Sequence, residues 1–198
     1  MNIILASSSP ARKRLLTRLQ LPFITISPDI DETAYKNEDA TALVSRLAKQ
    51  KAKKVAQTNP NSLIIASDQV AVIDGKITGK PLTHENAVKQ LSAVNGKICH
   101  FINGLCLLNS KTGHLQLATV PFDVKFRSLS PALIEYYLKR DKPYQCAGSI
   151  KSEGLAIILF EALLGSDPSA LEGLPLITLI QMLEKEDVFF QKPIPKLL

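Results

Sequence analysis

The sequence contains no tryptophan, and its 198 residues include only three cysteines. The cysteines, Cys99, Cys106 and Cys146, are odd in number and show no Cys-x-x-Cys spacing, which argues against a disulfide framework and a zinc site. Cys99 and Cys106 lie among apolar residues, so we expect buried thiols. His100 follows Cys99, but neighbours in a strand point to opposite faces, so we expect no catalytic Cys–His pair.

Long apolar runs and several well-known motifs are also missing. No stretch reaches the roughly 18 apolar residues that a membrane span needs, and the N-terminus lacks the basic start and the small-residue cleavage site of a signal peptide. We therefore expect a cytoplasmic location and no membrane partner. The sequence has no GxxxxGK[ST], GxGxxG, HExxH or GxSxG motif, which argues against P-loop enzymes, Rossmann dehydrogenases, zincins and α/β-hydrolases.

Length and charge set the broad class of the protein. A chain of this length forms one domain, or one domain with two lobes, and buries roughly 70% of its unfolded surface. The net charge is +6, with 24 basic and 18 acidic residues. Residues 1–57 hold 10 basic and 5 acidic residues, so they carry +5 of this charge. This suits a phosphate-bearing partner, either a nucleic acid or a nucleotide. Aromatic residues make up only 6% of the chain, which weakens the case for base-stacking nucleic-acid binding.

The order of hydrophobic patterns predicts an α/β fold. Strands and helices alternate early and a long hairpin follows, which favours a mixed twisted sheet with flanking helices, the hairpin bridging two lobes. The strands are expected at 2–6, 23–26, 63–66, 70–73, 76–78, 97–108 and 115–127. The helices are expected from Pro10 and at 41–57, 83–94, 130–139 and 174–184. Residues 143–160 mix strand and loop, and the chain from residue 189 is expected to fray.

The first predicted turn gathers hydroxyl groups and cations in the sequence Ser7-Ser8-Ser9-Pro10-Ala11-Arg12-Lys13-Arg14. Pro10 suits the first helical position, and Ser8 or Ser9 would cap the helix. A helix start is a ready anion site. Arg12 and Lys13 oppose the helix dipole there, and an anionic ligand would offset that cost. The alternative interpretation is a solvated basic turn.

Two further side chains occupy unusual positions. Asp68 follows the buried apolar run 63–66, and ligands of open α/β sheets bind beyond the carboxyl ends of strands. Asp68 is therefore where a catalytic carboxylate is expected, although an aspartate in a strand-ending turn is the alternative. Lys51 lies near the edge of the apolar stripe of helix 41–57, an odd place unless its ammonium group has a partner.

Cations and carboxylates together suit metal-assisted phosphoryl chemistry. Lysine and arginine neutralise a polyphosphate. Carboxylates bind a hard cation such as Mg²⁺ together with water, and one carboxylate can deprotonate a water molecule. The candidates are Ser8, Arg12, Lys13, Glu32, Lys51, Asp68 and Lys80. Taken alone, each of them is more often a solvated surface group.

Seven stretches, taken in order, are similar to those of the Maf family of nucleoside triphosphate pyrophosphatases, over roughly residues 2–186. They are Ser7–Arg14, Asp31–Thr33, Arg46–Ala52, Ser67–Val70, Gly79–Leu82, Cys146–Gly154 and Gly173–Leu176. The resemblance implies a two-lobed α/β domain over residues 1–188, with a cleft, related to inosine triphosphate pyrophosphatases, followed by a tail at 189–198. It also implies hydrolysis of a nucleoside triphosphate to the monophosphate and pyrophosphate with a divalent cation (Mg²⁺, Mn²⁺ or Co²⁺).

The same resemblance implies roles for the candidate residues. Asp68 would be the proton acceptor for the attacking water, and Glu32 would help to bind the metal or position that water. The metal ligands would be Glu32 and Asp68. The residues that would bind the substrate phosphates are Ser8, Arg12, Lys13, Lys51 and Lys80. Lys13 stands where the family usually has arginine, and a lysine keeps the charge but loses the planar guanidinium fork.

Three residues bear on the choice of base. Gln69 after Asp68 and the stretch containing Glu153 resemble the branch of the family that acts on 7-methyl-GTP, whereas the dTTP and UTP branch has Thr after the aspartate. The carboxylate of Glu153 could accept both N–H donors of a guanine edge, and methylation at N7 adds a positive charge. Ala11 replaces a tryptophan common in this branch, which removes an aromatic face for a cationic base.

Two alternatives remain beside 7-methyl-GTP hydrolysis. One is a pyrophosphatase for dTTP, UTP or another modified nucleotide. The other belongs to a different class: a non-enzymatic inhibitor of septum formation that binds nucleic acid or a division protein. We expect a nucleotide substrate and no nucleic acid, and the sequence leaves a homodimer open.

Overall fold

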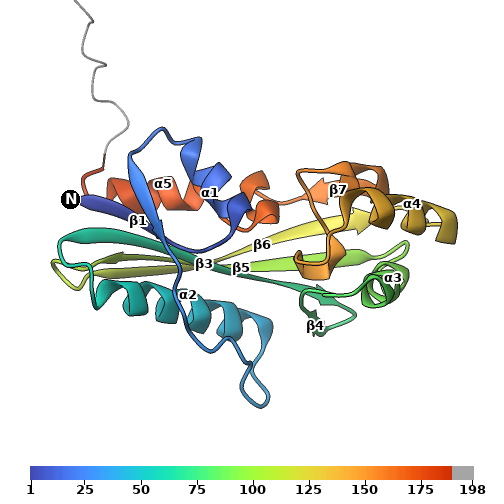
Figure 1. Ribbon diagram of the computed structural model, residues 1–198, viewed down its shortest axis with the longest axis horizontal. Helices are drawn as coiled ribbons and strands as arrows, with labels where there is room; N and C mark the ends of the chain where they lie inside the picture. Colours follow the sequence, from blue (N-terminus) through green and yellow to red (C-terminus); the bar gives the residue numbers. More distant parts are fainter. Residues whose placement is uncertain (189–198) are drawn as a thin grey trace, which may run out of the picture.

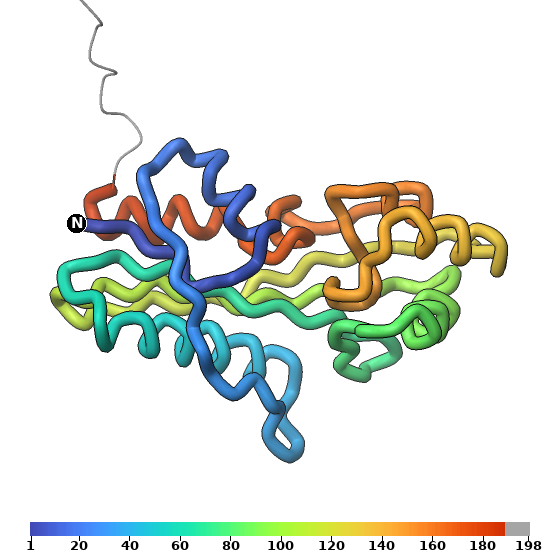
Figure 2. Tube along the Cα trace, in the orientation of Figure 1, coloured from blue at the N-terminus to red at the C-terminus, as the bar shows by residue number. Residues whose placement is uncertain are grey.

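The computed structural model describes residues 1–188 (Figures 1 and 2). The predicted tail at 189–198 lies outside the described residues. The strands are β1 (Asn2–Ala6), β2 (Phe23–Ile26), β3 (Ser62–Ile73), β4 (Lys76–Thr78), β5 (Ile98–Asn109), β6 (Leu115–Phe126) and β7 (Phe160–Leu164). The α-helices are α1 (Pro10–Thr17), α2 (Ala40–Ala56), α3 (His84–Ala93), α4 (Pro131–Asp141) and α5 (Leu176–Glu184). Three short 3₁₀ helices are η1 (Ala147–Ser149), η2 (Leu155–Leu159) and η3 (Pro168–Glu172).

The strands form one mixed sheet. Its order is β2-β1-β3-β5-β6-β7, and β4 pairs with the far end of β3. Strand β1 runs parallel to both of its neighbours, β2 and β3. The pairings of β3 with β5, of β5 with β6 and of β6 with β7 are antiparallel. This topology confirms the predicted α/β fold with a mixed sheet and flanking helices.

Four of the α-helices begin at capped positions. The side chains of Ser9, Asp39, Thr83 and Ser130 each accept a hydrogen bond from the backbone N–H three residues later. Of the two serines proposed to cap α1, Ser9 is the one that does so. These caps fix where α1 and α2 begin, and both helices carry side chains of the candidate site.

The sheet is covered on both faces at one end (Figure 1). Alternation along β1 sends Ile3 and Leu5 into a cluster with α1 and α5, whereas Ile4 and Ala6 pack against α2. Strand β1 is therefore buried on both of its faces, as its continuous apolar run indicates. No helix within residues 1–188 is both long and apolar enough to span a membrane.

A separate cluster, to which α3 and α4 both contribute residues, forms the core at the other end of the sheet. The long β5–β6 hairpin contributes to both ends, since Cys99 belongs to this cluster and Cys106 to the one under α2. Both thiols are buried, as expected, and burial raises the pKa of each to about 12. His100 is exposed, so the predicted separation of His100 from Cys99 is confirmed.

Strand β3 differs from the prediction. The sequence suggested one strand at 63–66, a turn at Asp68 and a second strand at 70–73, but β3 is continuous from Ser62 to Ile73. The reason is that β5 pairs with β3 without interruption from Leu63 to Val72. On the opposite edge, pairing with β1 stops at Ile65 and pairing with β4 starts only at Ala71. The polar residues Ser67–Gln69 lie between these two pairings, where β3 has no neighbouring strand on this edge within residues 1–188. Asp68 therefore lies beyond the carboxyl end of β1, although its own strand continues.

Candidate active site

Lys51 and Asp68 form a buried ion pair at the centre of the sheet. The Nζ atom of Lys51 donates to Oδ1 of Asp68 at 2.6 Å. Lys51 is only 5% exposed and Asp68 only 7%. The position of Lys51 at the edge of the apolar stripe predicted a partner for its ammonium group, and the carboxylate of Asp68 is that partner. A buried ion pair is a weak source of net stability because both charges lose their water, so function is the better reason for its presence.

Helix α2 reaches the sheet closely because Gly104 has no side chain. Gly104 is the residue of β5 directly opposite Asp68. A Cβ atom added to Gly104 would lie 2.2 Å from the carbonyl oxygen of Val44 in α2, closer than any real contact. The neighbouring Ser67 donates its hydroxyl to the Gly104 carbonyl at 2.9 Å. Lys51 lies two turns after Val44 in α2, so this close approach brings its ammonium group to the carboxylate of Asp68.

Glu32 joins the pair from the loop 27–39 that precedes α2. Its Oε1 atom lies 2.7 Å from Nζ of Lys51, so one ammonium group bridges two carboxylates. Partial burial acts to raise the pKa of Glu32, but the hydrogen bond and charge of Lys51, with the charges of Lys80 and Arg12, outweigh it and lower that pKa. Glu32 is therefore ionised at neutral pH.

Arg12 lies on the opposite side of the sheet, in the first turn of α1. Its Nε atom donates to the carbonyl oxygen of Gly173 at 2.9 Å. Burial lowers the pKa of Arg12, while the negative charges of Asp68 and Glu32 act in the opposite direction. The charge of Arg12 is thus close enough to act on both Asp68 and Glu32, and that of Lys80 is close enough to act on Glu32.

Gln69 is held by the same turn that receives Arg12. Its Nε2 atom donates to the carbonyl oxygens of Ala170 at 2.8 Å and Leu171 at 3.2 Å, both in η3. Gly173 follows η3 with a φ of 94°, a left-handed conformation that glycine adopts without strain. The amide group of Gln69 is therefore fixed against the backbone in this structure.

Three of the remaining candidates are solvent-exposed. Lys80 lies in the exposed loop after β4 and acts electrostatically on Glu32. Ser8 and Lys13 are also exposed, and within residues 1–188 neither side chain forms a hydrogen bond or ion pair. Ala11 is half-buried in α1, next to Arg12. The structure thus leaves Ser8, Lys13 and Lys80 accessible to an incoming ligand.

Glu153 is held by Arg14. The Nη2 atom of Arg14 lies 3.2 Å from Oε1 of Glu153 and 2.8 Å from Oε2 of Glu172. The hydrogen bond to Glu172 outweighs desolvation and raises the pKa of Arg14, with further support from Glu153. The carboxylate that the sequence assigns to base recognition therefore already has a cationic partner one helical turn beyond Ala11.

The donors present fit a divalent metal ion bound together with a substrate. Mg²⁺ usually binds through one or two carboxylates plus phosphate oxygens and water, and Glu32 and Asp68 supply two neighbouring carboxylates. Residues 1–188 contain no group of three or more His, Cys, Asp or Glu side chains suited to a metal ion. A metal held by protein ligands alone is thus not supported by the described part of the chain.

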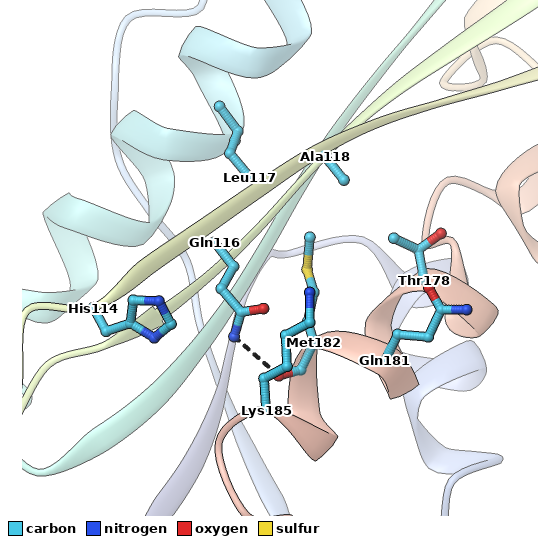
Figure 3. A pocket seen from close by; sticks show the side chains of 8 residues that line it. All are labelled: His114, Gln116, Leu117, Ala118, Thr178, Gln181, Met182 and Lys185. Carbon is cyan, nitrogen blue, oxygen red and sulfur yellow. Dashed lines mark hydrogen bonds between the residues drawn. The ribbon is translucent and has the colours of Figure 1, made fainter.

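Two surface grooves lie outside the buried ion pair. One has a volume of about 380 Å³ and lies between β6 and α5, where Gln116 donates to the carbonyl oxygen of Met182 (Figure 3). The other, of about 390 Å³, runs between the loop 27–39 and α2 and includes Arg46. Neither groove is lined by Asp68 or Lys51.

The sequence interpretation missed the roles of two arginines. The sequence analysis gave Arg46 no separate role, yet its side chain is only 16% exposed and is paired with Glu38. Arg14 was not separated from the other cations of α1, although it binds both Glu153 and Glu172. Helical spacing shows which face a cation occupies, but the acidic partners lie outside these helices: Glu38 in the loop before α2, and Glu172 in η3.

Comparisons with known proteins agree with this architecture. A family model described as Maf-like protein matches residues 2–186. A protein of Alcanivorax borkumensis is 54% identical over 94% of this chain and 94% of its own length. A protein of Methylobacillus flagellatus is also 54% identical, over 94% of this chain and 97% of its own length. Both relatives carry the name 7-methyl-GTP pyrophosphatase.

The fold is similar to that of a solved structure. The Ham1 protein of Staphylococcus aureus superposes with a TM-score of 0.54 and covers 94% of this chain and 100% of its own. The sequence identity is 14%, so this similarity concerns the fold alone.

Proposed function

The chain belongs to the Maf family, and we propose that it hydrolyses 7-methyl-GTP to 7-methyl-GMP and pyrophosphate. The observation that carries this proposal is the single ammonium group of Lys51 bridging Asp68 and Glu32. The two relatives named 7-methyl-GTP pyrophosphatase support the choice of substrate. We infer that the triphosphate lies over these residues, between the two ends of the sheet.

Asp68 accepts the proton of the attacking water. The water oxygen forms a bond to the α-phosphorus, the bond from that phosphorus to the α,β-bridging oxygen breaks, and pyrophosphate leaves with the bridging oxygen. The water proton passes to the carboxylate of Asp68, which Lys51 holds in place at 2.6 Å. Positioned carboxylates of this kind contribute about 10²–10⁴-fold to a rate.

Cationic side chains neutralise the triphosphate. Lys51, Arg12 and Lys80 lie close enough to influence the carboxylates electrostatically, and Ser8 and Lys13 line the start of α1. The N-terminus of α1 adds the partial positive charge of a helix start. Charges placed in advance around the reacting phosphorus stabilise the transition state more than water does.

A divalent cation fits this arrangement. Glu32 and Asp68 would hold it together with the substrate, and a bound Mg²⁺, Mn²⁺ or Co²⁺ would neutralise charge on the phosphates.

Base recognition falls to Gln69, Glu153 and Ala11. The Glu153 carboxylate is suited to accept both donors of a guanine edge, and its negative charge favours the positively charged 7-methylguanine. Without an aromatic side chain at position 11, the base gains no stacking surface from this turn. Discrimination therefore depends on hydrogen bonding and charge.

A nucleotide panel tests the proposal. Purified protein with Mg²⁺ or Mn²⁺ is incubated with 7-methyl-GTP, GTP, dTTP and UTP, and the phosphate products are resolved. We expect 7-methyl-GTP to be the preferred substrate and pyrophosphate to be released. Preference for dTTP or UTP would overturn the guanine assignment. Salt-dependent oligonucleotide binding without hydrolysis of any nucleotide would favour the non-enzymatic alternative.

A further inference from the structure

We propose that Arg46 is a positioning residue that holds the loop 27–39 on α2, so that Glu32 stays beside Lys51. The inference deepens the proposed function, because it concerns how one carboxylate of that site is kept in place. Arg46 touches neither Asp68 nor Lys51 among the described contacts, and it acts through the loop.

Arg46 engages the loop through its Nε and Nη2 atoms, while its Nη1 atom donates to Oε1 of Gln50 within α2 at 3.1 Å. Its Nε and Nη2 atoms donate to the two carboxylate oxygens of Glu38 at 2.6 and 2.7 Å, a bidentate pair. Nη2 also donates to the carbonyl oxygen of Thr33 at 3.0 Å. The guanidinium carbon lies 3.9 Å from the centre of the Tyr35 ring. Three positions of the loop therefore converge on one side chain of α2.

The rest of the loop offers little to hold it. Residues 27–39 contain no helix or strand. Apart from the cap at Asp39, the described hydrogen bonds and ion pairs from this loop to α2 involve only Arg46 and Lys51. The groove of about 390 Å³ separates part of the loop from α2, and Ile30 alone packs on the apolar cluster below.

Lys51 cannot serve as the anchor of the loop during turnover. Its ammonium group already contacts both Asp68 and Glu32, and a phosphate would compete for the same donors. An anchor outside the reaction centre keeps Glu32 in place when the contacts of Lys51 change. Arg46 meets this requirement, since it lies in the same helix but binds Glu38, six residues beyond Glu32.

The ion pair of Arg46 and Glu38 stays charged around neutral pH. The side-chain hydrogen bond from Arg46 lowers the pKa of Glu38 to about 2. The same hydrogen bond raises the pKa of Arg46. The pair is therefore insensitive to pH around neutrality, unlike a histidine-based latch.

A double-mutant cycle tests whether Arg46 acts through Glu32. The variants are Arg46→Ala, Glu32→Gln and the two combined, with kcat/KM measured for 7-methyl-GTP. We expect Arg46→Ala to lower kcat/KM by about 10–100-fold in the wild-type background, as supporting residues of a site do. In the Glu32→Gln background the further loss should be below about threefold, because coupled residues are not additive. Equal losses in both backgrounds would overturn the inference.

Two further variants separate positioning from folding. Glu38→Gln removes the negative charge and one of the two acceptor oxygens that Arg46 binds on the loop, and it should reproduce part of the loss. Arg46→Lys keeps the charge without the bidentate fork and should recover only part of it. Arg140→Ala is the matched control, since Arg140 stacks on Tyr136 at 4.1 Å in α4, at the other end of the molecule. The control should keep wild-type activity, and wild-type activity in Arg46→Ala would contradict the inference.

Hydrogen exchange gives a readout that does not depend on turnover. The backbone amides of residues 30–38 should exchange faster in Arg46→Ala than in the wild type, while those of β3 should not change. If the wild type hydrolysed no nucleotide but the loop still loosened, the proposed function would fail and the anchoring role would stand. Unchanged exchange in the loop would overturn the anchoring role whatever the activity.

Discussion

The Nζ atom of Lys51 lies 2.6 Å from Oδ1 of Asp68, and both side chains are buried. The two residues come from α2 and β3, and Gly104 on β5 makes room for that helix to reach the strand. The pair therefore depends on backbone packing as much as on charge. Glu32 completes it from a loop that Arg46 fastens to the same helix.

The first prediction concerns the stability of this pair. Lys51→Met leaves the buried Asp68 without its cation and should lower the free energy of unfolding by roughly 3–5 kcal/mol. Adding Asp68→Asn to that variant should restore part of the loss, because the unpaired charge is then removed. Urea unfolding of both variants measures this. Wild-type stability in Lys51→Met would show that the pair is not buried in solution.

The second prediction concerns the close approach of α2. Gly104→Ala puts a Cβ atom 2.2 Å from the Val44 carbonyl oxygen, so the helix must move away from the sheet. We expect a loss of about 1–3 kcal/mol in stability and a fall in activity, since Lys51 moves with the helix. Gly79→Ala is the control for stability, because its new Cβ meets no atom within 4 Å. Equal melting temperatures for the two variants would refute this account.

The third prediction concerns acid stability. The hydrogen bond from Arg46 lowers the pKa of Glu38 from 4.5 to about 2 in the folded protein. A lowered folded-state pKa gives stability that is present above the unfolded value and lost as the pH falls through the folded value. The wild type should therefore lose its advantage over Glu38→Gln between pH 4.5 and about 2. Urea unfolding at several pH values checks this, and a constant difference down to pH 2 would be inconsistent with the lowered pKa.

The fourth prediction concerns base selection. Arg14→Ala removes the cation that lies 3.2 Å from Glu153, so the carboxylate faces the base with its full charge. The ratio of kcat/KM for 7-methyl-GTP to that for GTP should rise by about two- to fivefold, the scale of a half-exposed ion pair. Arg18→Ala, at the end of the same helix, is the control. A lower ratio in Arg14→Ala would mean that Arg14 itself favours the methylated base.

Local sequence patterns predicted much of the fold. The cap and proline at the start of α1, the apolar stripe of α2 and the long β5–β6 hairpin follow from local chemistry, and the structure confirms them. The turn predicted at Asp68 was wrong because polar residues within a strand look like its end. Only the uninterrupted pairing with β5 keeps the strand going.

The site itself was predictable only in part. The edge position of Lys51 on its helix indicated a partner, but not which carboxylate it would be. The role of Gly104 depends on its contact with a distant segment, at Val44, and that of Arg46 on how the loop before α2 folds back onto the helix, at Glu38. No local pattern reports such contacts, because a glycine in a strand and an arginine in a helix have many other uses.

Hydrolysis of 7-methyl-GTP in water enriched in heavy oxygen, by the wild type and by Asp68→Asn side by side, tests the central claim most directly. We predict that the wild type places the label in 7-methyl-GMP and releases unlabelled pyrophosphate, because water attacks the α-phosphorus. The folded Asp68→Asn protein should release pyrophosphate about 10²–10⁴-fold more slowly. Label in the pyrophosphate, or release by Asp68→Asn at the wild-type rate, would contradict the mechanism.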